Sequence, residues 1–536
     1  MFLPPILRRL FSASPIVAPL LLALTVITLF VGFSGVHQHV VPTAWVGGPG
    51  VGGAVQAGAV AANNNGAGIP TPAPPDDDDD NRLPPAYAAY FSDLQLPTEL
   101  ASVPVLGARL RAFLRRPVQT YAEAREGNDA HCPAALADRL VNPDQLRNEG
   151  AWWEALAAGE VVRRRAQLVG ALADVDTTVR LLATLRVLRK LDVDLPVEVF
   201  HYPDEQVNDG QRQEIEELGG TLVEATGVTK TPGQWKNWQI KPLALIQSSF
   251  SEILYLDSDN MPLRSPVHLF DAPNYVAGGR AAFWPDLSKD HAKNAVWRVM
   301  GEACTLAEWT FESGQLVVSK AGNQGLNLAA LHIAAAMMAD DAGSPHSGNG
   351  DDDDDAAHLS ARGFWLKMCG GDKDAFRWAF RALDIGYVPA PRWMSALGFL
   401  NGADGRFCGH TTLQHDLVTP TGYTAPPPLF VHANLLKHLG GGGGFGTGPG
   451  RQRLFSHVKR MALDDAGITS LNYARMTVYT GPRNMCLDLG VEDSAEAAEG
   501  LGENKVETVE VADLEGNPFD GFEDLFFAAG GKVGGW

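Results

Sequence analysis

Two aspartates one residue apart, Asp257 and Asp259, follow directly after an apolar run, Ile253 to Leu256. The run predicts a buried strand, and Pro262 ends regular pairing shortly after it. Both carboxylates are therefore expected at the carboxyl end of a strand, where open α/β sheets bind ligands. Hard divalent cations prefer oxygen ligands and are often held by one or two carboxylates together with substrate phosphates. The pair thus predicts a site for a metal ion and a diphosphate, as nucleotide-sugar transferases have.

The Asp-x-Asp pair has two other possible interpretations. An EF-hand calcium loop is excluded, because its sixth and twelfth positions require Gly and Glu but hold Pro262 and His268 here. The other alternative is a chance Asp-x-Asp without function. The strand before the pair and the turn after it favour the functional interpretation.

Strand-like and helix-like segments alternate on either side of the pair. The patterns predict strands at 166–172, 196–202, 221–224 and 253–256, and helices at 175–191, 211–218 and 240–250. Alternation of this kind indicates βαβ units. The predicted fold class is therefore α/β, a doubly wound and mainly parallel sheet.

Further acids and an amide lie in short polar motifs after the pair. Asp286 ends Phe-Trp-Pro-Asp after a strand-like segment, 274–277, and is expected either to bind sugar hydroxyls or to cap a helix starting near Leu287. Glu312 and Gln315 belong to Glu-Ser-Gly-Gln before an apolar strand. They are expected to lie in a loop that hydrogen-bonds a sugar, with simple turn chemistry as the alternative.

A third motif, Gly-Gly-Asp-Lys-Asp, precedes a predicted helix at 375–383. Its acids are Asp372 and Asp374. They either cap the first turn of that helix or bind the donor sugar, because the two glycines allow a ligand close to the backbone.

The ordered set of motifs resembles the fungal Golgi α-mannosyltransferases of glycosyltransferase family 71, over roughly residues 165–440. The matching pieces are Leu195-Pro-Val-Glu-Val, Lys241-Pro-Leu-Ala-Leu, the segment 249–264 around the Asp-x-Asp, Phe283-Trp-Pro-Asp, Glu312-Ser-Gly-Gln, Gly371-Asp-Lys-Asp-Ala-Phe, Gln414-His-Asp and Leu429-Phe-Val-His-Ala-Asn-Leu-Leu-Lys. The resemblance implies a GT-A-type fold, GDP-mannose as the donor and a mannose-containing glycan as the acceptor. It also implies that the α configuration of the mannose is retained and that the new linkage is α-1,2 or α-1,3.

The resemblance also implies roles for individual residues. Asp257 and Asp259 are expected to hold Mn²⁺ or Mg²⁺, with His432 as a third ligand because related sites often recruit a late His; a purely structural His is the alternative. Lys241 and Lys437 are expected to contact the donor, although a solvated surface Lys is the alternative for Lys437. Gln315 and Asp374 complete the predicted donor contacts.

The candidate catalytic acids are Asp286, Glu312 and Asp372. Spacing in the sequence assigns none of them as a nucleophile. We therefore expect same-face displacement, in which the metal ion and cationic side chains carry the electrostatics.

The N-terminal part predicts a membrane anchor. Arg8 and Arg9 precede residues 15–33, which carry no charge and as a helix would span about 28 Å. Basic residues on the short side predict the N-terminus in the cytosol and the rest of the chain in the lumen; a cleaved signal peptide is the alternative. The resemblance implies that this single-pass type II protein lies in the Golgi membrane. The expected organisation is a cytosolic tail (1–14), an anchor (15–33), a flexible luminal stem (34–94) and a luminal transferase domain (95–536) with a low-complexity insertion (341–357).

The amino-acid composition limits the classes of function that this protein could have. Ten of the negative charges behind the net charge of −20 lie in two runs of five Asp, at 76–80 and 351–355, and the balance argues against nucleic-acid binding. The five cysteines include no Cys-x-x-Cys pair; one or two disulfides are expected, with at least one free thiol. The resemblance further implies a complex with other Golgi transferases. The remaining alternatives are a UDP-sugar transferase on the same scaffold and a non-catalytic membrane-anchored scaffold.

Overall fold

The computed structural model describes residues 164–169, 175–203, 205, 207–227, 238–290, 294, 296–297, 308–338, 365–366, 369, 371–402, 404–440, 444–461, 474–481, 484–491 and 506–534. All of them belong to one compact unit of the chain. The predicted anchor (15–33), stem (34–94) and insertion (341–357) lie outside the described residues. Within the described ranges, no helix combines the length and the hydrophobicity that a bilayer crossing needs.

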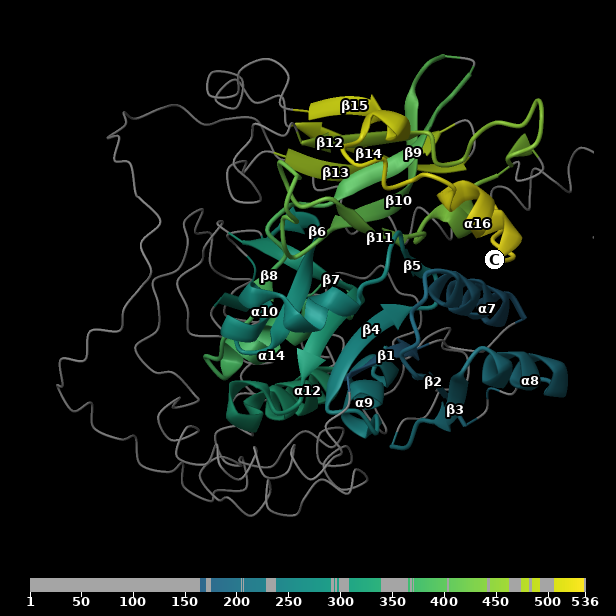
Figure 1. The fold of residues 1–536 in the computed structure, drawn as a ribbon. Helices are drawn as coiled ribbons and strands as arrows, with labels where there is room; N and C mark the ends of the chain where they lie inside the picture. The colour runs from purple at the N-terminus through teal and green to yellow at the C-terminus, as the bar shows by residue number, and fades with distance from the viewer. Residues whose placement is uncertain are drawn as a thin grey trace, which may run out of the picture. The chain divides into compact units, whose positions relative to one another are not determined.

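Seven of the described strands form a mixed sheet in the order β3-β2-β1-β4-β7-β6-β8 (Figure 1). The half from β3 to β4 is parallel throughout. β7 runs antiparallel to both β4 and β6, and β8 pairs in parallel with β6. The strands are β1 (Arg164–Val169), β2 (Val197–His201), β3 (Gly220–Glu224), β4 (Glu252–Asp257), β6 (Ala281–Lys289), β7 (Trp309–Ser319) and β8 (Val388–Pro389).

Helices cover both faces of this sheet because its central strands are apolar on both sides. In β4, Ile253 and Tyr255 pack into the core with α9, α12 and α14, whereas Leu254 and Leu256 pack with α7 and α10. Successive side chains of a strand point to opposite faces, so one apolar run supplies both cores. The predicted α/β class is confirmed. The helices are α7 (Val175–Lys190), α8 (Asp209–Glu217), α9 (Ile240–Gln247), α10 (Pro273–Ala277), α12 (Leu326–Met337) and α14 (Ala375–Ala382), with 3₁₀ turns η3 (Val267–Asp271) and η4 (Gly322–Gly325).

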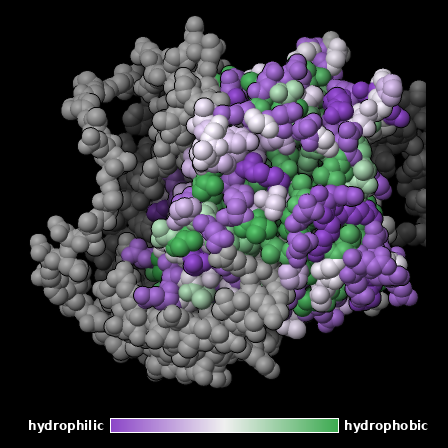
Figure 2. Space-filling model, viewed as in Figure 1, coloured by the Kyte–Doolittle hydropathy of each residue, from purple (hydrophilic) through white to green (hydrophobic). Residues whose placement is uncertain are grey.

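α8 illustrates how local sequence sets an element of this layer. A capping box starts it, in which Asn208 accepts from the backbone N–H of Gln211 and the Gln211 side chain accepts from the N–H of Asn208. Ile215 is its buried residue, and Arg212 and Glu216 are exposed. Hydrophilic side chains accordingly gather over this part of the surface (Figure 2).

Three sequence expectations after β4 are wrong. Residues 274–277 are helical in α10, because Pro273 stands in the first turn with its φ already set for a helix. No helix starts near Leu287, since β6 runs on to Lys289 with register shifts that accommodate Pro285. The motif with Glu312 is part of β7 and not a loop.

A second sheet of eight described strands is antiparallel and includes the C-terminal part of the chain. Its main path is β13-β14-β10-β9-β12-β15, and β11 pairs with both β10 and β5. The elements are β5 (Asn260–Pro262), β9 (Ser395–Leu400), β10 (Phe407–His415), β11 (Pro428–His432), β12 (His457–Met461), β13 (Ala474–Gly481), β14 (Asn484–Val491) and β15 (Val506–Glu510), with η6 (Leu436–His438), η8 (Val511–Asp513) and α16 (Phe522–Ala528).

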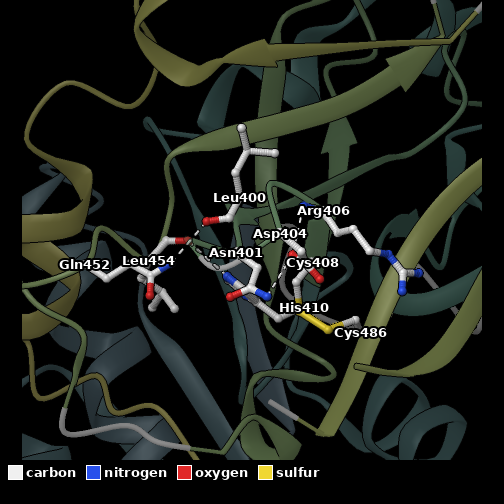
Figure 3. The surroundings of a disulfide bond; sticks show 9 residues. All are labelled: Leu400, Asn401, Asp404, Arg406, Cys408, His410, Gln452, Leu454 and Cys486. Carbon is white, nitrogen blue, oxygen red and sulfur yellow. Dashed lines mark hydrogen bonds between the residues drawn. A yellow bond between two sulfur atoms is a disulfide. The ribbon is translucent and has the colours of Figure 1, made fainter. Parts of the chain in front are cut away.

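One disulfide joins two strands of this sheet. Cys408 of β10 is bonded to Cys486 of β14 (Figure 3). Beside it, the side chain of Asn401 donates to Asp404, and a ring nitrogen of His410 lies 3.1 Å from the carbonyl oxygen of Leu454. Cys369 is a buried free thiol. Both the expected disulfide and the expected leftover thiol are therefore present.

Candidate active site

Asp257 and Asp259 lie at the carboxyl end of β4. Asp257 is the last residue of the strand, and Asp259 follows one residue later in the turn to β5. Their side chains are 20% and 11% exposed, so both are mostly buried but remain accessible. Thr184 of α7 donates its hydroxyl hydrogen to the carbonyl oxygen of Ser258 at 2.7 Å. This bond attaches the turn to the helix layer.

The pairing of β11 with β5 brings His432 to the two aspartates. In the antiparallel register His432 lies opposite Asn260, the residue directly after Asp259. The N–H of Ala433 donates to the carbonyl oxygen of Asp259 at 2.9 Å. The imidazole therefore reaches the end of β4 through strand pairing between segments far apart in the sequence.

These three side chains form a cluster that could hold a metal ion. His432 Nε2 lies 3.5 Å from Asp259 Oδ1 and 3.9 Å from Asp257 Oδ2. One ligand atom from each residue lies within 4.8 Å of the others. Carboxylates are typical ligands of Mg²⁺ and Mn²⁺, and imidazole is a common ligand of transition metals. The mixed donor set could therefore hold a divalent metal ion, and it consists of the three residues predicted as metal ligands.

Glu312 holds the opposite nitrogen of the His432 ring. Its Oε2 lies 2.7 Å from His432 Nδ1. A carboxylate accepts only, so Nδ1 carries the hydrogen, and in neutral His this leaves the Nε2 lone pair facing the aspartates. The other oxygen, Oε1, accepts from the amides of Gln315 and Gln414 at 2.7 and 2.6 Å. A fixed carboxylate behind a ligating His is the usual way in which proteins orient a metal ligand.

The charges of the cluster shift its protonation. Burial alone would lower the pKa of His432, but the charge of Glu312 and hydrogen bonds to Asp259 and Glu312 outweigh it and raise the pKa to about 10. Burial would raise the pKa of Asp259, but the charges of Lys437 and His432 hold it well below its usual range. In the absence of a metal ion, a protonated imidazole thus partly neutralises the carboxylates.

Gly314 makes room for the His432 ring. A Cβ at this position would meet His432 Nδ1 at 2.4 Å and Cε1 at 2.5 Å. Its carbonyl oxygen accepts from Asn260 Nδ2 at 2.8 Å. The glycine of the Glu-Ser-Gly-Gln motif therefore leaves space for the ring of a histidine that lies on another strand.

Gly314→Ala should displace the imidazole and weaken metal binding. We expect the affinity for Mn²⁺ to fall by about 10- to 100-fold, as for loss of an outer-shell partner, while overpacking lowers the free energy of unfolding by about 1–3 kcal/mol. Calorimetric titration with Mn²⁺ and thermal unfolding measure the two effects. Gly402→Ala is the matched control, because a Cβ there meets nothing within 4 Å. Unchanged Mn²⁺ affinity would show that His432 is not a ligand.

Lys241 lies between two acids at the same edge of the sheet. Its Nζ is 3.0 Å from Asp257 Oδ2 and 2.7 Å from Asp372 Oδ2, and it donates to Ser313 Oγ at 3.0 Å. Burial would lower the pKa of Lys241, but the charges of Asp257 and Asp372 raise it above its usual value. The ammonium group thus connects Asp372 to Asp257 of the candidate metal cluster.

Lys437 also lies at the cluster, and Asp286 forms a separate ion pair. Lys437 Nζ is 3.3 Å from Asp259 Oδ2. Asp286, in β6, accepts from Lys373 Nζ at 2.8 Å. Burial would lower the pKa of Lys373, but the charge of Asp286 raises it. Asp286 is mostly buried, and Lys373 is partly exposed.

Asp374 faces a different environment from Asp372, two residues earlier. Its Oδ1 accepts from the backbone N–H of Phe311 at 2.7 Å, and its Oδ2 from Arg377 at 2.8 Å. Arg377 also pairs with Asp290. Burial raises the pKa of Asp374 to about 8, although Arg377 opposes the shift. Neither aspartate caps α14 through its side chain, because the residue at its N-cap, Asp374, makes no capping bond and Asp372 turns to Lys241.

Gln315 is fully buried and forms a hydrogen bond with Glu312. Its amide nitrogen donates to Glu312, and its amide oxygen accepts from Asn260. The structure thus brings seven of the ten predicted site residues into one connected group and places Gln315 behind it. Asp286 and Asp374 are held in ion pairs of their own. The connected group comprises Asp257, Asp259, His432, Glu312, Lys241, Asp372 and Lys437.

Sequence reasoning did not single out several residues that complete the site. Tyr255 donates its hydroxyl hydrogen to Asp257 Oδ1, and Ser313 donates to Asp372 Oδ2. Asn260 and Gln414 hold the amide network around Glu312. Each lies inside a motif that carried the family resemblance, so the signal was the motif as a whole and not the residue type.

Comparison with known proteins agrees with this geometry. Residues 168–323 match the family model Mannosyl_trans3, described as "Mannosyltransferase putative". The α-1,2-mannosyltransferase MNN21 of Candida albicans is 31% identical over 120 residues, which are 20% of this chain and 18% of that protein. The α-1,2-mannosyltransferase MNN2 of Saccharomyces cerevisiae is 32% identical over 107 residues, 19% of this chain and 18% of that protein.

The match is local. The chain aligns with less than a fifth of the length of these curated relatives. Among solved structures, the galactosyltransferase LgtC, in complex with donor and acceptor sugar analogues, is 13% identical and covers 42% of this chain and 73% of its own. Its TM-score is 0.27. Over residues 168–323, the predicted resemblance to the fungal α-mannosyltransferases is confirmed by the family match and the curated relatives.

Proposed function

We propose that this chain is a retaining, metal-dependent mannosyltransferase of GT-A type that moves mannose from GDP-mannose to a mannose-containing glycan. One observation carries the proposal. Asp257, Asp259 and His432 meet at the carboxyl end of a parallel strand, within 4.8 Å of one another, and the strand lies inside the segment that matches the mannosyltransferase family. The linkage formed, α-1,2 or α-1,3, is part of the proposal; the named relatives are α-1,2-mannosyltransferases.

The roles of the residues follow from their contacts. Asp257, Asp259 and His432 would hold the cation, which when bound supplies positive charge to the departing diphosphate. Tyr255 and Lys241 fix the Asp257 carboxylate from two sides. Water is limited at the site, because these carboxylates are mostly buried. Lower polarity strengthens every electrostatic interaction with the donor.

The candidate acids differ in their freedom to act as a nucleophile. Both oxygens of Glu312 are engaged, one by His432 and the other by two amides. Asp372 is paired with Lys241 and Ser313 through one oxygen. Asp286 is paired with Lys373. Because each of the three acids is already paired with neighbouring side chains, we infer same-face displacement, in which no enzyme carboxylate attacks the sugar.

The proposal extends to location. The uncharged segment 15–33 after Arg8 and Arg9 supports a single-pass type II anchor in the Golgi membrane, with the transferase domain in the lumen. A glycan acceptor and a nucleotide sugar would meet there.

The decisive experiment measures sugar transfer and donor binding together. Full-length protein is incubated with labelled GDP-mannose, UDP-glucose or UDP-galactose and an α-mannoside acceptor, each with Mn²⁺ or with a chelator. We expect transfer from GDP-mannose alone, lost on chelation, and stabilisation by GDP with Mn²⁺ of about 2.7 kcal/mol at a concentration of 100 Kd. Transfer from a UDP-sugar would replace the donor, and neither transfer nor nucleotide binding would favour the scaffold alternative.

A further inference from the structure

Arg180 is a buried arginine on the face of α7 that is turned toward the end of β4. Thr177, Arg180 and Thr184 are three and four residues apart, so they share one face of the helix. Thr184 hydrogen-bonds the carbonyl oxygen of Ser258, between the two metal-ligand aspartates. Arg180 lies one turn before that contact, and its Nη2 donates to Thr177 Oγ1 at 2.8 Å.

The guanidinium of Arg180 has donors without partners. The residue is only 9% exposed. Within the part of the chain that the structure describes, its Nε and Nη1 make no hydrogen bond. Arginine remains protonated in proteins, and a buried cation without a paired anion is unfavourable. Arg377 of α14 shows the contrast, because its guanidinium contacts the carboxyl groups of both Asp290 and Asp374.

Two cationic side chains from separate elements, Lys437 of η6 and Arg180 of α7, lie at the end of β4 that carries Asp259. Lys437 Nζ lies 3.3 Å from Asp259 Oδ2. These two cations thus give this side of the aspartate pair a positive field. Such a field attracts a second anion.

We propose that Arg180 binds the diphosphate of the nucleotide-sugar donor through its unpartnered Nε–H and Nη1–H groups. The inference rests on the proposed function, since it requires a phosphate-bearing donor beside Asp257 and Asp259. The planar guanidinium matches a phosphate with two parallel hydrogen bonds, which a lysine does not offer. Arg180 is therefore a binding residue for the leaving group, supplied by the first helix of the described fold.

Phosphate probes test this assignment without an activity assay. GDP, UDP and inorganic pyrophosphate are titrated calorimetrically into the full-length protein with Mn²⁺, and into Arg180→Gln and Arg180→Lys. We expect the glutamine variant to bind GDP and pyrophosphate about 10- to 100-fold more weakly, as for loss of charge-assisted hydrogen bonds. The lysine variant should lose less, because it keeps the charge. The ratio of GDP to UDP affinity should not change, since the guanidinium recognises phosphate and not the base.

Controls separate binding from stability. Arg212→Gln, at an exposed position of α8, should leave every affinity unchanged. Arg180→Gln should retain or raise the Tm of the ligand-free protein, because it removes an unpaired buried charge. Arg180→Lys decides the case if the glutamine variant does not fold. Unchanged pyrophosphate affinity in a folded Arg180 variant would overturn the inference.

The inference and the proposed donor can fail separately. If the wild type binds UDP but not GDP, and Arg180→Gln loses UDP, the role of Arg180 stands and the choice of donor falls. If GDP binds the wild type and Arg180→Gln equally well, the proposed donor stands and the role of Arg180 falls. If no phosphate probe binds the wild type, both are overturned.

Discussion

Replacing both Asp257 and Asp259 by asparagine is expected to abolish metal-dependent nucleotide binding and to lower sugar transfer by about a thousandfold or more. A metal ion is worth several kcal/mol of charge stabilisation, and each 1.36 kcal/mol is about a tenfold change in rate. Asparagine preserves the volume of each side chain but removes both charges that face His432. Transfer from labelled GDP-mannose and GDP titration with Mn²⁺ measure the two losses.

The fold should survive this double substitution. Lys241 keeps Asp372 as a partner, and both positions lie at the accessible edge of the sheet. The matched control is Asp513→Asn, at an exposed aspartate of η8, which should leave transfer and binding unchanged. If the double variant is folded and still transfers sugar at the wild-type rate, the cluster is not the catalytic metal site.

Replacing Glu312 by glutamine is expected to disable His432 as a ligand without emptying the site. The carbonyl oxygen of the new amide can accept from Gln315 and Gln414, as Glu312 Oε1 does. Its NH₂ group then faces His432 Nδ1, which must become the acceptor. The ring hydrogen moves to Nε2 and points at the aspartates, so the lone pair needed for the metal is lost. We expect Mn²⁺ affinity at high pH to fall by about 10- to 100-fold.

The pH dependence supplies a second readout for Glu312. In the metal-free protein, the pKa of His432 is raised to about 10 from an unperturbed value of about 6.5. Its stabilising contribution is therefore fully present below pH 6.5 and is lost as the pH rises through about 10. A metal ion competes with the same proton, so Mn²⁺ affinity of the wild type should rise across this window.

Glu312→Gln should shift this rise to lower pH, because the charge that retains the proton is gone. Mn²⁺ titrations from pH 6 to pH 10 measure the shift, and Glu216→Gln on the exposed side of α8 is the control. Identical profiles for wild type and Glu312→Gln would mean that Glu312 does not act through His432.

The predictability of the candidate site differs from residue to residue. Asp257 and Asp259 could be found from the sequence because a strand and the carboxylate pair that follows it are local features. The expectation that Pro262 ends regular pairing is wrong, since Pro262 lies in β5 and pairs with Phe430. His432 entered only through the family resemblance, and its place depends on the β11–β5 register. Asp372 and Asp374 belong to one motif, yet one contacts Lys241 and the other Arg377. The two side chains point to different partners at the start of α14, and a sequence motif does not record side-chain direction.

Local patterning was sufficient to predict the α/β class, the alternation of β1 to β4 with their helices, and the position of Asp257 and Asp259 at the end of a strand, since these depend on residue patterns over short segments. It was not sufficient for the antiparallel second sheet, the Cys408–Cys486 pairing or the buried guanidinium of Arg180. Each of these depends on which distant segments pack together. Strand register and helix orientation are set by burial of the whole core, and a single segment of sequence does not contain that information.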